Sequence, residues 1–137
     1  MNYWLLKTEP ETFSYADLES LGSDRWNGVR NFRALKYMRA MEPGDQLFIY
    51  HTGKEKAIMG VAVVLTSAYP DPEEQDTRYV VIDVKPVYML NRPVTLQEIK
   101  SNSFFADWVL VKQPRLSVMP VTPAHWLEIH NLSNTRT

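Results

Sequence analysis

The stretch AIMGVAVVLTSAY, residues 57–69, is apolar and rich in β-branched side chains. Such a run predicts a buried strand, and Gly60 within it predicts a bulge or a point of close approach. The acidic stretch DPEEQD (71–76) has the composition of a loop. Beyond it, TRYVVIDVKPVYML (77–90) predicts a second strand that breaks near Pro86. Two long strands in succession favour a fold built around a β-sheet.

Shorter apolar runs extend the predicted sheet toward both ends of the chain. They are YWLLKT (3–8), QLFIYHT (46–52), DWVLV (107–111) and PRLSVMPV (114–121). Helix-start signals lie between these runs: Ser14 with Asp17, Thr95 with Glu98, and Thr122 before Pro123. The sequence therefore predicts one α+β domain over residues 1–137. About five or six short strands would curl into a barrel-like sheet with helices against its outside.

A helix with two contrasting faces is predicted from about Asn31 to Met41. Its apolar face would carry Ala34, Leu35, Met38 and Met41. Its opposite face would carry the cations Arg33, Lys36 and Arg39. We expect the first face to be buried and the second to face solvent.

Composition excludes several classes of protein. The chain has a formal net charge of -1, which argues against a protein that coats DNA through overall positive charge. There are no cysteines, so neither disulfides nor thiolate chemistry operate. The apolar runs are too short to span a membrane, and MNYWLLKTEP (1–10) lacks the features of a signal peptide. We expect a cytoplasmic protein, or a nuclear one in a eukaryote, that is monomeric and makes no membrane contact.

Motifs of metal sites and common catalytic sites are absent from the sequence. His51, His125 and His130 have no metal-ligand spacing, and no serine lies in a nucleophile-elbow pattern. No glycine-rich phosphate motif is present either. We therefore expect no cofactor and no metal.

Positive charge is concentrated in RWNGVRNFRALKYMRAM (25–41), which has five basic residues and no acidic one. Asn27 and Asn31 bracket Gly28 near the predicted helix start, where free N–H groups favour an anion. Arg30 suits a phosphate, and Trp26 offers a flat face on which a base could stack. The simpler interpretation is a buried Trp, a turn glycine and a solvated basic helix face. Composition alone does not separate the two.

Six blocks of sequence, in order along nearly the whole chain, resemble the EVE domain family, a relative of the PUA and YTH domains. The blocks are NYWLLKTEP (2–10), WNGVRN (26–31), MEPGDQLFIYHT (41–52), IMGVAVV (58–64), AYPDP (68–72) and RLSVMPVT (115–122). Asn27 stands where the family commonly has Asp, and Phe32 stands where a tyrosine often follows. The resemblance implies a PUA-like fold, a curved β pseudo-barrel with a cleft for a nucleobase.

The resemblance also implies a partner, a nucleic acid that carries a modified base. A C5-modified cytosine in DNA is favoured, with RNA as the alternative. The ligand-binding residues that it implies are Lys7, Thr8, Trp26, Asn27, Gly28, Val29, Arg30, Asn31, Tyr50, His51, Ser117 and Pro120. Arg33, Lys36 and Arg39 would contact phosphates. The acidic loop 71–76 is expected to lie away from this face, because like charges repel.

Two other functions fit the sequence less well. Some PUA-like relatives of the ASCH type act on acylated cytidine through a lysine, a threonine and a glutamate. Lys7, Thr8 and Glu9 match these residue types, but alternation along a strand would put Thr8 on the opposite face from its neighbours. The second alternative is an accessory RNA-binding domain that does not distinguish modified bases.

Overall fold

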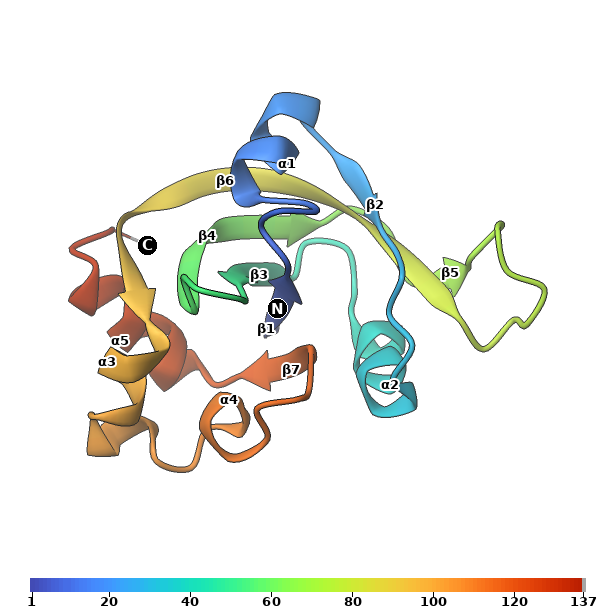
Figure 1. Cartoon of the computed structure of the whole chain (residues 1–137). Helices are drawn as coiled ribbons and strands as arrows, with labels where there is room; N and C mark the ends of the chain where they lie inside the picture. The colour runs from blue at the N-terminus through green and yellow to red at the C-terminus, as the bar shows by residue number, and fades with distance from the viewer. Residues whose placement is uncertain (137) are drawn as a thin grey trace.

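The computed structural model describes residues 1–136 and has the predicted α+β architecture (Figure 1). Seven strands pair within these residues: β1 (Tyr3–Thr8), β2 (Asp24–Trp26), β3 (Gln46–His51), β4 (Ala57–Val64), β5 (Tyr69–Pro70), β6 (Val80–Thr95) and β7 (Val118–Val121). The strand order is β2-β6-β4-β3-β1-β7, and β5 pairs with β6 off this path. The sheet curls into a half-barrel, which confirms the predicted curved pseudo-barrel. The strands beyond the expected five or six are the very short β2 and β5.

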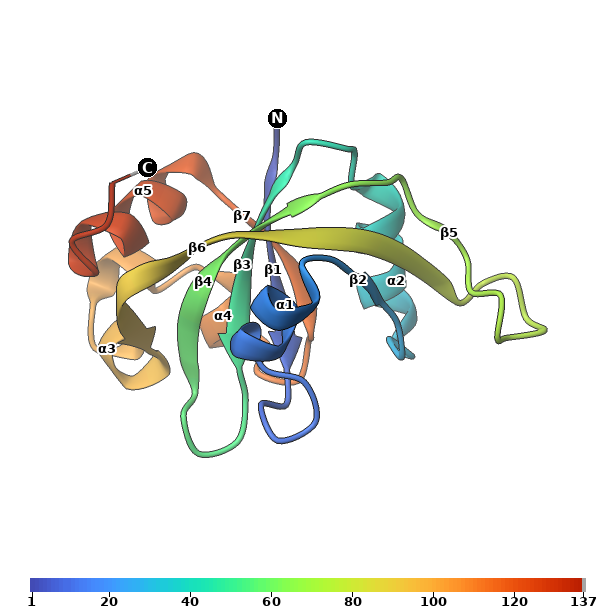
Figure 2. The same ribbon diagram turned by 90° about the horizontal axis from the view of Figure 1, so that it is seen from above.

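Five α-helices surround the sheet: α1 (Tyr15–Leu21), α2 (Phe32–Ala40), α3 (Leu96–Lys100), α4 (Val109–Lys112) and α5 (Pro123–Leu132). A 3₁₀ turn, η1 (Ser103–Phe105), lies between α3 and α4. Helix α1 lies over the outer side of β6, and α2 contacts both β6 and β7 (Figures 1 and 2). Because β6 and β7 lie toward the two ends of the strand order, α2 closes the open side of the half-barrel.

Local capping interactions begin the helices where the sequence predicts. Ser14 and Asp17 form a reciprocal capping box at α1. The Asn31 side chain accepts hydrogen bonds from the N–H groups of Arg33 and Ala34. Thr95 and Thr122 cap α3 and α5 in the same manner. Each cap is a contact between near neighbours in the chain, which is why the sequence alone identifies it.

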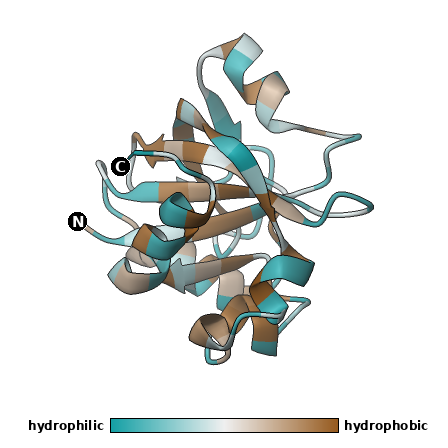
Figure 3. Ribbon diagram, turned by 90° about the vertical axis from the view of Figure 1, so that its left-hand side faces the viewer, coloured by the Kyte–Doolittle hydropathy of each residue, from teal (hydrophilic) through white to brown (hydrophobic). Residues whose placement is uncertain are grey.

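Hydrophobic residues run along the central strands (Figure 3), and their buried side chains belong to one core cluster. The predicted apolar face of α2 is buried, since Ala34, Leu35 and Met38 are fully covered and Met41 nearly so. Trp126 of α5 stacks on Phe48 with 4.0 Å between ring centroids. The core thus joins helices from both ends of the chain to the central strands.

The sheet has two irregular positions, one at Gly60 and one at Pro86. A Cβ on Gly60 would lie 2.7 Å from the ring of Tyr15, so the predicted close approach is confirmed. The predicted break at Pro86 is wrong, because β6 runs unbroken through it. The pairing with β4 shifts register near Pro86 instead, where a residue without an N–H can sit at a bulge.

One predicted strand is a helix. Residues 107–111 were expected to be extended, but Val109–Lys112 form α4. The N–H groups of Val111 and Lys112 both turn back to donate to the Trp108 carbonyl, at 2.9 and 3.1 Å. A short apolar run has no period of its own, so tertiary packing decides its conformation.

The carboxylate of Asp45 joins the start of β1 to the turn that precedes β3. It accepts hydrogen bonds from the N–H groups of Asn2 and Glu42 and from the Trp4 indole, each at 3.0 Å. Burial of Asp45 would raise the pKa of this carboxyl, but the three hydrogen bonds outweigh burial and hold its pKa below the ordinary value. A buried negative charge thus fixes the position of β1.

Replacing Asp45 by Asn should lower the free energy of unfolding at neutral pH by about 2–4 kcal/mol, because an amide cannot satisfy all three donors. The Asp45 pKa is depressed in the folded state. Its contribution is therefore complete above the unfolded-state pKa of about 4 and is lost as pH falls through the lower folded-state value. Urea unfolding of wild type and variant at pH values from about 7 down to about 3 measures this. A difference that does not shrink toward acid pH would contradict the assignment.

Candidate functional site

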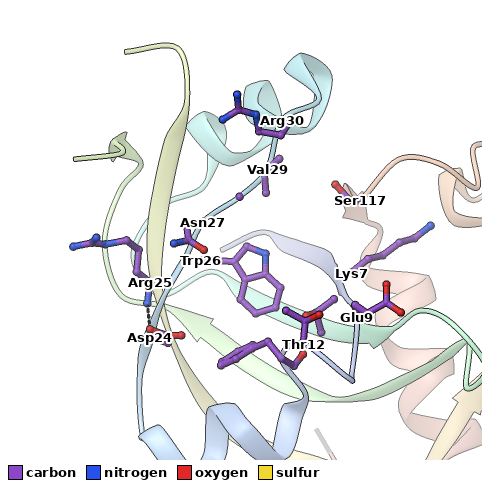
Figure 4. Close-up of a pocket in the computed structure, with 13 residues that line it drawn as sticks. Lys7, Glu9, Thr12, Asp24, Arg25, Trp26, Asn27, Val29, Arg30 and Ser117 are labelled. Atoms are coloured by element: carbon purple, nitrogen blue, oxygen red, sulfur yellow. Dashed lines mark hydrogen bonds between the residues drawn. The ribbon is translucent and has the colours of Figure 1, made fainter. Parts of the chain in front are cut away.

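A cavity of about 580 Å³ opens beside the end of β1 (Figure 4). Three segments line it: residues 7–9 with 12–13, residues 24–30, and Ser117. Figure 4 shows the Trp26 indole in the centre of this lining, with Val29 and Arg30 on one side and Lys7 and Ser117 across the opening. Its volume is within the range of cavities that hold small molecules.

Backbone and side-chain hydrogen bonds bring these segments together. The Lys7 N–H donates to the Ser117 carbonyl at 2.9 Å, which joins β1 to the segment before β7. The Thr8 hydroxyl donates to the Phe13 carbonyl at 2.7 Å, which folds the following loop back toward the strand. Trp26 ends β2, where it pairs with Ile82 of β6. The cavity is therefore held by the ends of three strands.

Trp26 supplies a flat aromatic wall. The side chain is 7% exposed and meets the Phe13 ring edge-on, at 6.0 Å and 80°. Within residues 1–136 the Trp26 indole N–H donates to no protein acceptor. Its nitrogen is not fully buried, so the N–H is open to the cavity. Gly28 follows with a φ of +78°, a conformation that favours glycine and turns the chain around the rim. Part of the indole surface and its N–H donor thus border the cavity.

Two cations of the lining have partners in the protein. Lys7 Nζ donates to the Pro114 carbonyl at 2.8 Å, and its burial lowers the pKa of the ammonium group. Arg30 pairs with Glu74 at 2.5 Å and lies over the Tyr79 ring at 3.9 Å. The third cation, Arg25, donates to the Tyr69 hydroxyl at 3.3 Å. Because Glu9 and Asp24 also line the cavity, the formal charge of the lining is +1, from three cations and two carboxylates.

The expectation that the acidic loop lies apart from the predicted site is wrong. Glu74 of this loop holds Arg30, which lines the cavity. The loop is positioned by aromatic contacts that join it to α2, since Phe32 stacks on Tyr79 at 5.6 Å and Arg78 lies over Phe32 at 4.9 Å. These contacts join segments that are more than forty residues apart, so charge patterning alone does not reveal them.

Eight of the twelve expected ligand-binding residues line the cavity: Lys7, Thr8, Trp26, Asn27, Gly28, Val29, Arg30 and Ser117. Asn31 lies outside it because its side chain caps α2. Tyr50 is buried, with Lys7 Nζ 5.5 Å from its ring centroid. Pro120 pairs with Trp4, further along β7.

His51 also lies outside the cavity and has a structural role. Its Nε2 accepts the N–H of Tyr15 at 3.0 Å, and its Nδ1 lies 3.2 Å from Glu55. The ring is buried in these contacts. His51 therefore anchors the start of α1 to β3.

Sequence reasoning missed five residues of the lining: Glu9, Thr12, Phe13, Asp24 and Arg25. Glu9 to Phe13 form a loop whose direction depends on the Thr8 hydrogen bond. Asp24 and Arg25 belong to a three-residue strand, too short to show alternation. The sequence does contain one signal for this part of the lining, the aromatic Phe13 in the loop between β1 and the Ser14 cap.

Lys7, Thr8 and Glu9 all contribute to the cavity lining. The Lys7 and Thr8 side chains nevertheless bond different segments, at Pro114 and at Phe13, in keeping with alternation along β1. Within the described part of the chain, none of these side chains hydrogen-bonds another. The Thr8 hydroxyl gives its proton to a carbonyl, so it is not paired with a base.

The three cations expected to contact phosphates do not share one direction. Arg33 bonds the Gln113 side chain before β7, whereas Arg39 donates to the Arg78 carbonyl at 2.6 Å. No hydrogen bond or ion pair involves the Lys36 side chain within residues 1–136. The helix therefore presents different cations to different neighbours.

Residues 1–136 contain no group of three His, Asp or Glu side chains arranged to hold a metal ion. None of the helices in this part of the chain is both long and apolar enough to cross a membrane. The cavity beside β1 is the candidate functional site. Its aromatic wall, polar edge and cations suit a planar heterocycle joined to an anion.

Comparison with known proteins places these features in a family. The EVE domain family matches residues 2–132. Thymocyte nuclear protein 1 of Mus musculus is 31% identical over 168 residues, which cover 98% of this chain and 74% of that protein.

Solved structures share the fold. A protein from Agrobacterium tumefaciens is 35% identical, with 98% of this chain and 94% of that chain covered and a TM-score of 0.95. The human THYN1 protein, in complex with 5-methylcytosine-containing DNA, is 28% identical with both chains fully covered and a TM-score of 0.90. An ASCH protein from Zymomonas mobilis is only 14% identical, covers 96% of this chain and 95% of its own, and has a TM-score of 0.59, which indicates a shared fold alone. The match over residues 2–132 establishes that this chain belongs to the EVE domain family.

Proposed function

We propose that this chain is a reader of modified nucleic acid that takes one extruded base into the cavity beside β1. The observation that carries the proposal is the Trp26 ring, which walls a cavity of about 580 Å³ between Lys7 and Arg30. The structure of a relative bound to 5-methylcytosine-containing DNA supports it. A C5-modified cytosine in DNA is the favoured ligand, and a base in RNA is the alternative.

The energetics of the proposal are balanced. Extruding a base from a duplex costs a few kcal/mol. Stacking on an aromatic side chain returns roughly 1–3 kcal/mol, and hydrogen bonds to the base edge return more. The Trp26 N–H, the Asn27 amide and the Thr8 oxygen are polar groups of the lining that could meet such an edge. A net gain then requires contacts to the backbone as well.

Preference for a modification needs more than added apolar surface. A buried methyl group contributes only ~0.8 kcal/mol, or about fourfold in affinity. Val29 could receive such a methyl group, because it lines the cavity next to the loop glycine. A hydroxymethyl or formyl group that meets a buried polar partner could discriminate more strongly.

Binding is favoured over catalysis. An ASCH-like amidohydrolase would need Lys7, Thr8 and Glu9 to act on one another or on a shared substrate atom. The Thr8 hydroxyl instead donates to the Phe13 carbonyl, and the Lys7 ammonium donates to Pro114. An assay of product formation on acylated cytidine would test the enzymatic alternative, and turnover would contradict the binding proposal.

We propose a single domain that acts as a monomer, in the cytoplasm or, in a eukaryote, in the nucleus. Asn31, Tyr50, His51 and Pro120 would act indirectly, by holding the elements that form the cavity. Arg33, Lys36 and Arg39 remain candidates for phosphate contacts.

Trp26→Ala should weaken binding of an oligonucleotide with one 5-methylcytosine by about 1–3 kcal/mol, because the stacking wall is lost. It should also erase any preference over the unmodified oligonucleotide, while the salt dependence of binding stays nearly unchanged. Fluorescence anisotropy with labelled single and double strands of DNA and RNA measures these quantities. Trp26→Phe keeps an aromatic wall and is the matched control. If Trp26→Ala folds normally and retains the preference, the base binds elsewhere.

Glu74→Gln should strengthen binding up to about fivefold, because the Glu74 carboxylate competes with a phosphate for Arg30 and an exposed ion pair contributes ~0.2–1 kcal/mol. The gain should decline as salt is raised. Glu73→Gln removes the same charge from the same loop without contacting Arg30, and should have a smaller effect. Equal effects of the two variants would mean that only the net charge of the loop matters.

A further inference from the structure

We propose that a second cavity, adjacent to the first, binds a backbone phosphate of the nucleotide next to the extruded base. Arg33 and Arg115 are the two residues that would hold the phosphate. This inference rests on the proposed function, because it assigns a place to the strand whose base enters the first cavity.

The second cavity has a volume of about 450 Å³. It is lined by Asn31, Arg33, Gln113, Pro114, Arg115 and Leu116. The lining has two guanidinium groups and two side-chain amides, and it has no carboxylate. Its formal charge is therefore +2, from Arg33 and Arg115.

The two cavities share a wall. Lys7 lines the first cavity, and its Nζ donates to the carbonyl of Pro114, which lines the second. Arg30 and Asn31 are neighbours in the chain, and they line different cavities. The same is true of Leu116 and Ser117. The base could thus occupy the first cavity while the adjoining backbone phosphate occupies the second.

Within the described residues, 1–136, the two arginines of the second cavity pair with no carboxylate. Arg30, Arg78 and Arg92 each pair with a carboxylate. Arg33 instead bonds the neutral Gln113 side chain, which orients its guanidinium without neutralising it. Within residues 1–136 the Arg115 side chain has no ion pair and no hydrogen bond. Two uncompensated guanidinium groups from different segments suit phosphate oxygens.

Other cations fit this role less well. Arg39 does not line the second cavity, and its guanidinium donates to the Arg78 carbonyl. Lys54, Lys56 and Lys100 line a third cavity, but Glu55 lines it with them. Lys54 and Lys100 therefore provide controls with the same change of charge at a separate site.

The test compares 5-methyl-2′-deoxycytidine with its 3′,5′-bisphosphate, and then with a 5-methylcytosine oligonucleotide at several salt concentrations. Calorimetry and anisotropy give the affinities of wild type, Arg115→Gln, Arg33→Gln, and the two controls Lys54→Gln and Lys100→Gln. For wild type the bisphosphate should bind at least tenfold more tightly than the nucleoside, and Arg115→Gln should remove most of this gain. Arg115→Gln should also weaken the oligonucleotide about tenfold and reduce the salt slope by about 0.7–0.9. Arg33→Gln should act alike, and the two controls should change affinity less than twofold.

The outcomes separate the subsite from the base cavity. If binding depends on Trp26 but Arg115→Gln behaves like Lys100→Gln, the phosphate subsite is rejected and the proposed function stands. If binding depends on Arg115 but not on Trp26, the subsite is supported and the base cavity is rejected. If wild type binds none of these ligands, both proposals are rejected. Arg115 is exposed, and its side chain forms no hydrogen bond or ion pair within residues 1–136. A loss confined to the phosphorylated ligands would therefore not reflect unfolding.

Discussion

The last two residues of β1 hold three separate segments of the chain together, and the candidate site exists because they do. The Lys7 N–H bonds the Ser117 carbonyl, the Thr8 hydroxyl bonds the Phe13 carbonyl, and the Thr8 carbonyl accepts the N–H of Thr52 at 2.9 Å. Each bond satisfies a polar group that the end of a strand would otherwise leave unpaired. The parallel pairing of β1 with β3 and the buried Asp45 charge fix where this strand ends.

Local pairing of charges explains how a chain of net charge -1 could bind a polyanion. Carboxylates pair with Arg78 and Arg92, and Glu74 holds Arg30 at the rim. Within residues 1–136 Arg33 and Arg115, which both line the second cavity, have no acidic partner. A phosphate would therefore meet a positive field beside the aromatic wall, while the rest of the surface would not retain nucleic acid in general.

What the sequence predicts well depends on neighbouring residues, and what it misses depends on distant ones. The Ser14 cap and the buried face of α2 follow from spacing within one or two turns. The unbroken strand at Pro86 depends instead on pairing with β4, and the position of Glu74 depends on aromatic contacts with α2. The loop that carries Trp26 could be identified from its residues and from family resemblance. Lys7, Thr8 and Ser117 could be identified from the resemblance as well. Thr12, Phe13, Asp24 and Arg25 could not, because a loop and a three-residue strand carry too little pattern.

The central claim is that the base enters the cavity beside Trp26, and photo-crosslinking tests it most directly. An oligonucleotide with one 5-iodocytosine, which carries its reactive atom at C5, would be irradiated in complex with the protein and the crosslinked peptide identified by mass spectrometry. We predict attachment within residues 7–13 or 24–30, which supply nearly all of the cavity lining. Attachment confined to the outer surface of α2, α3 or α5, with neither of those segments modified, would contradict the claim.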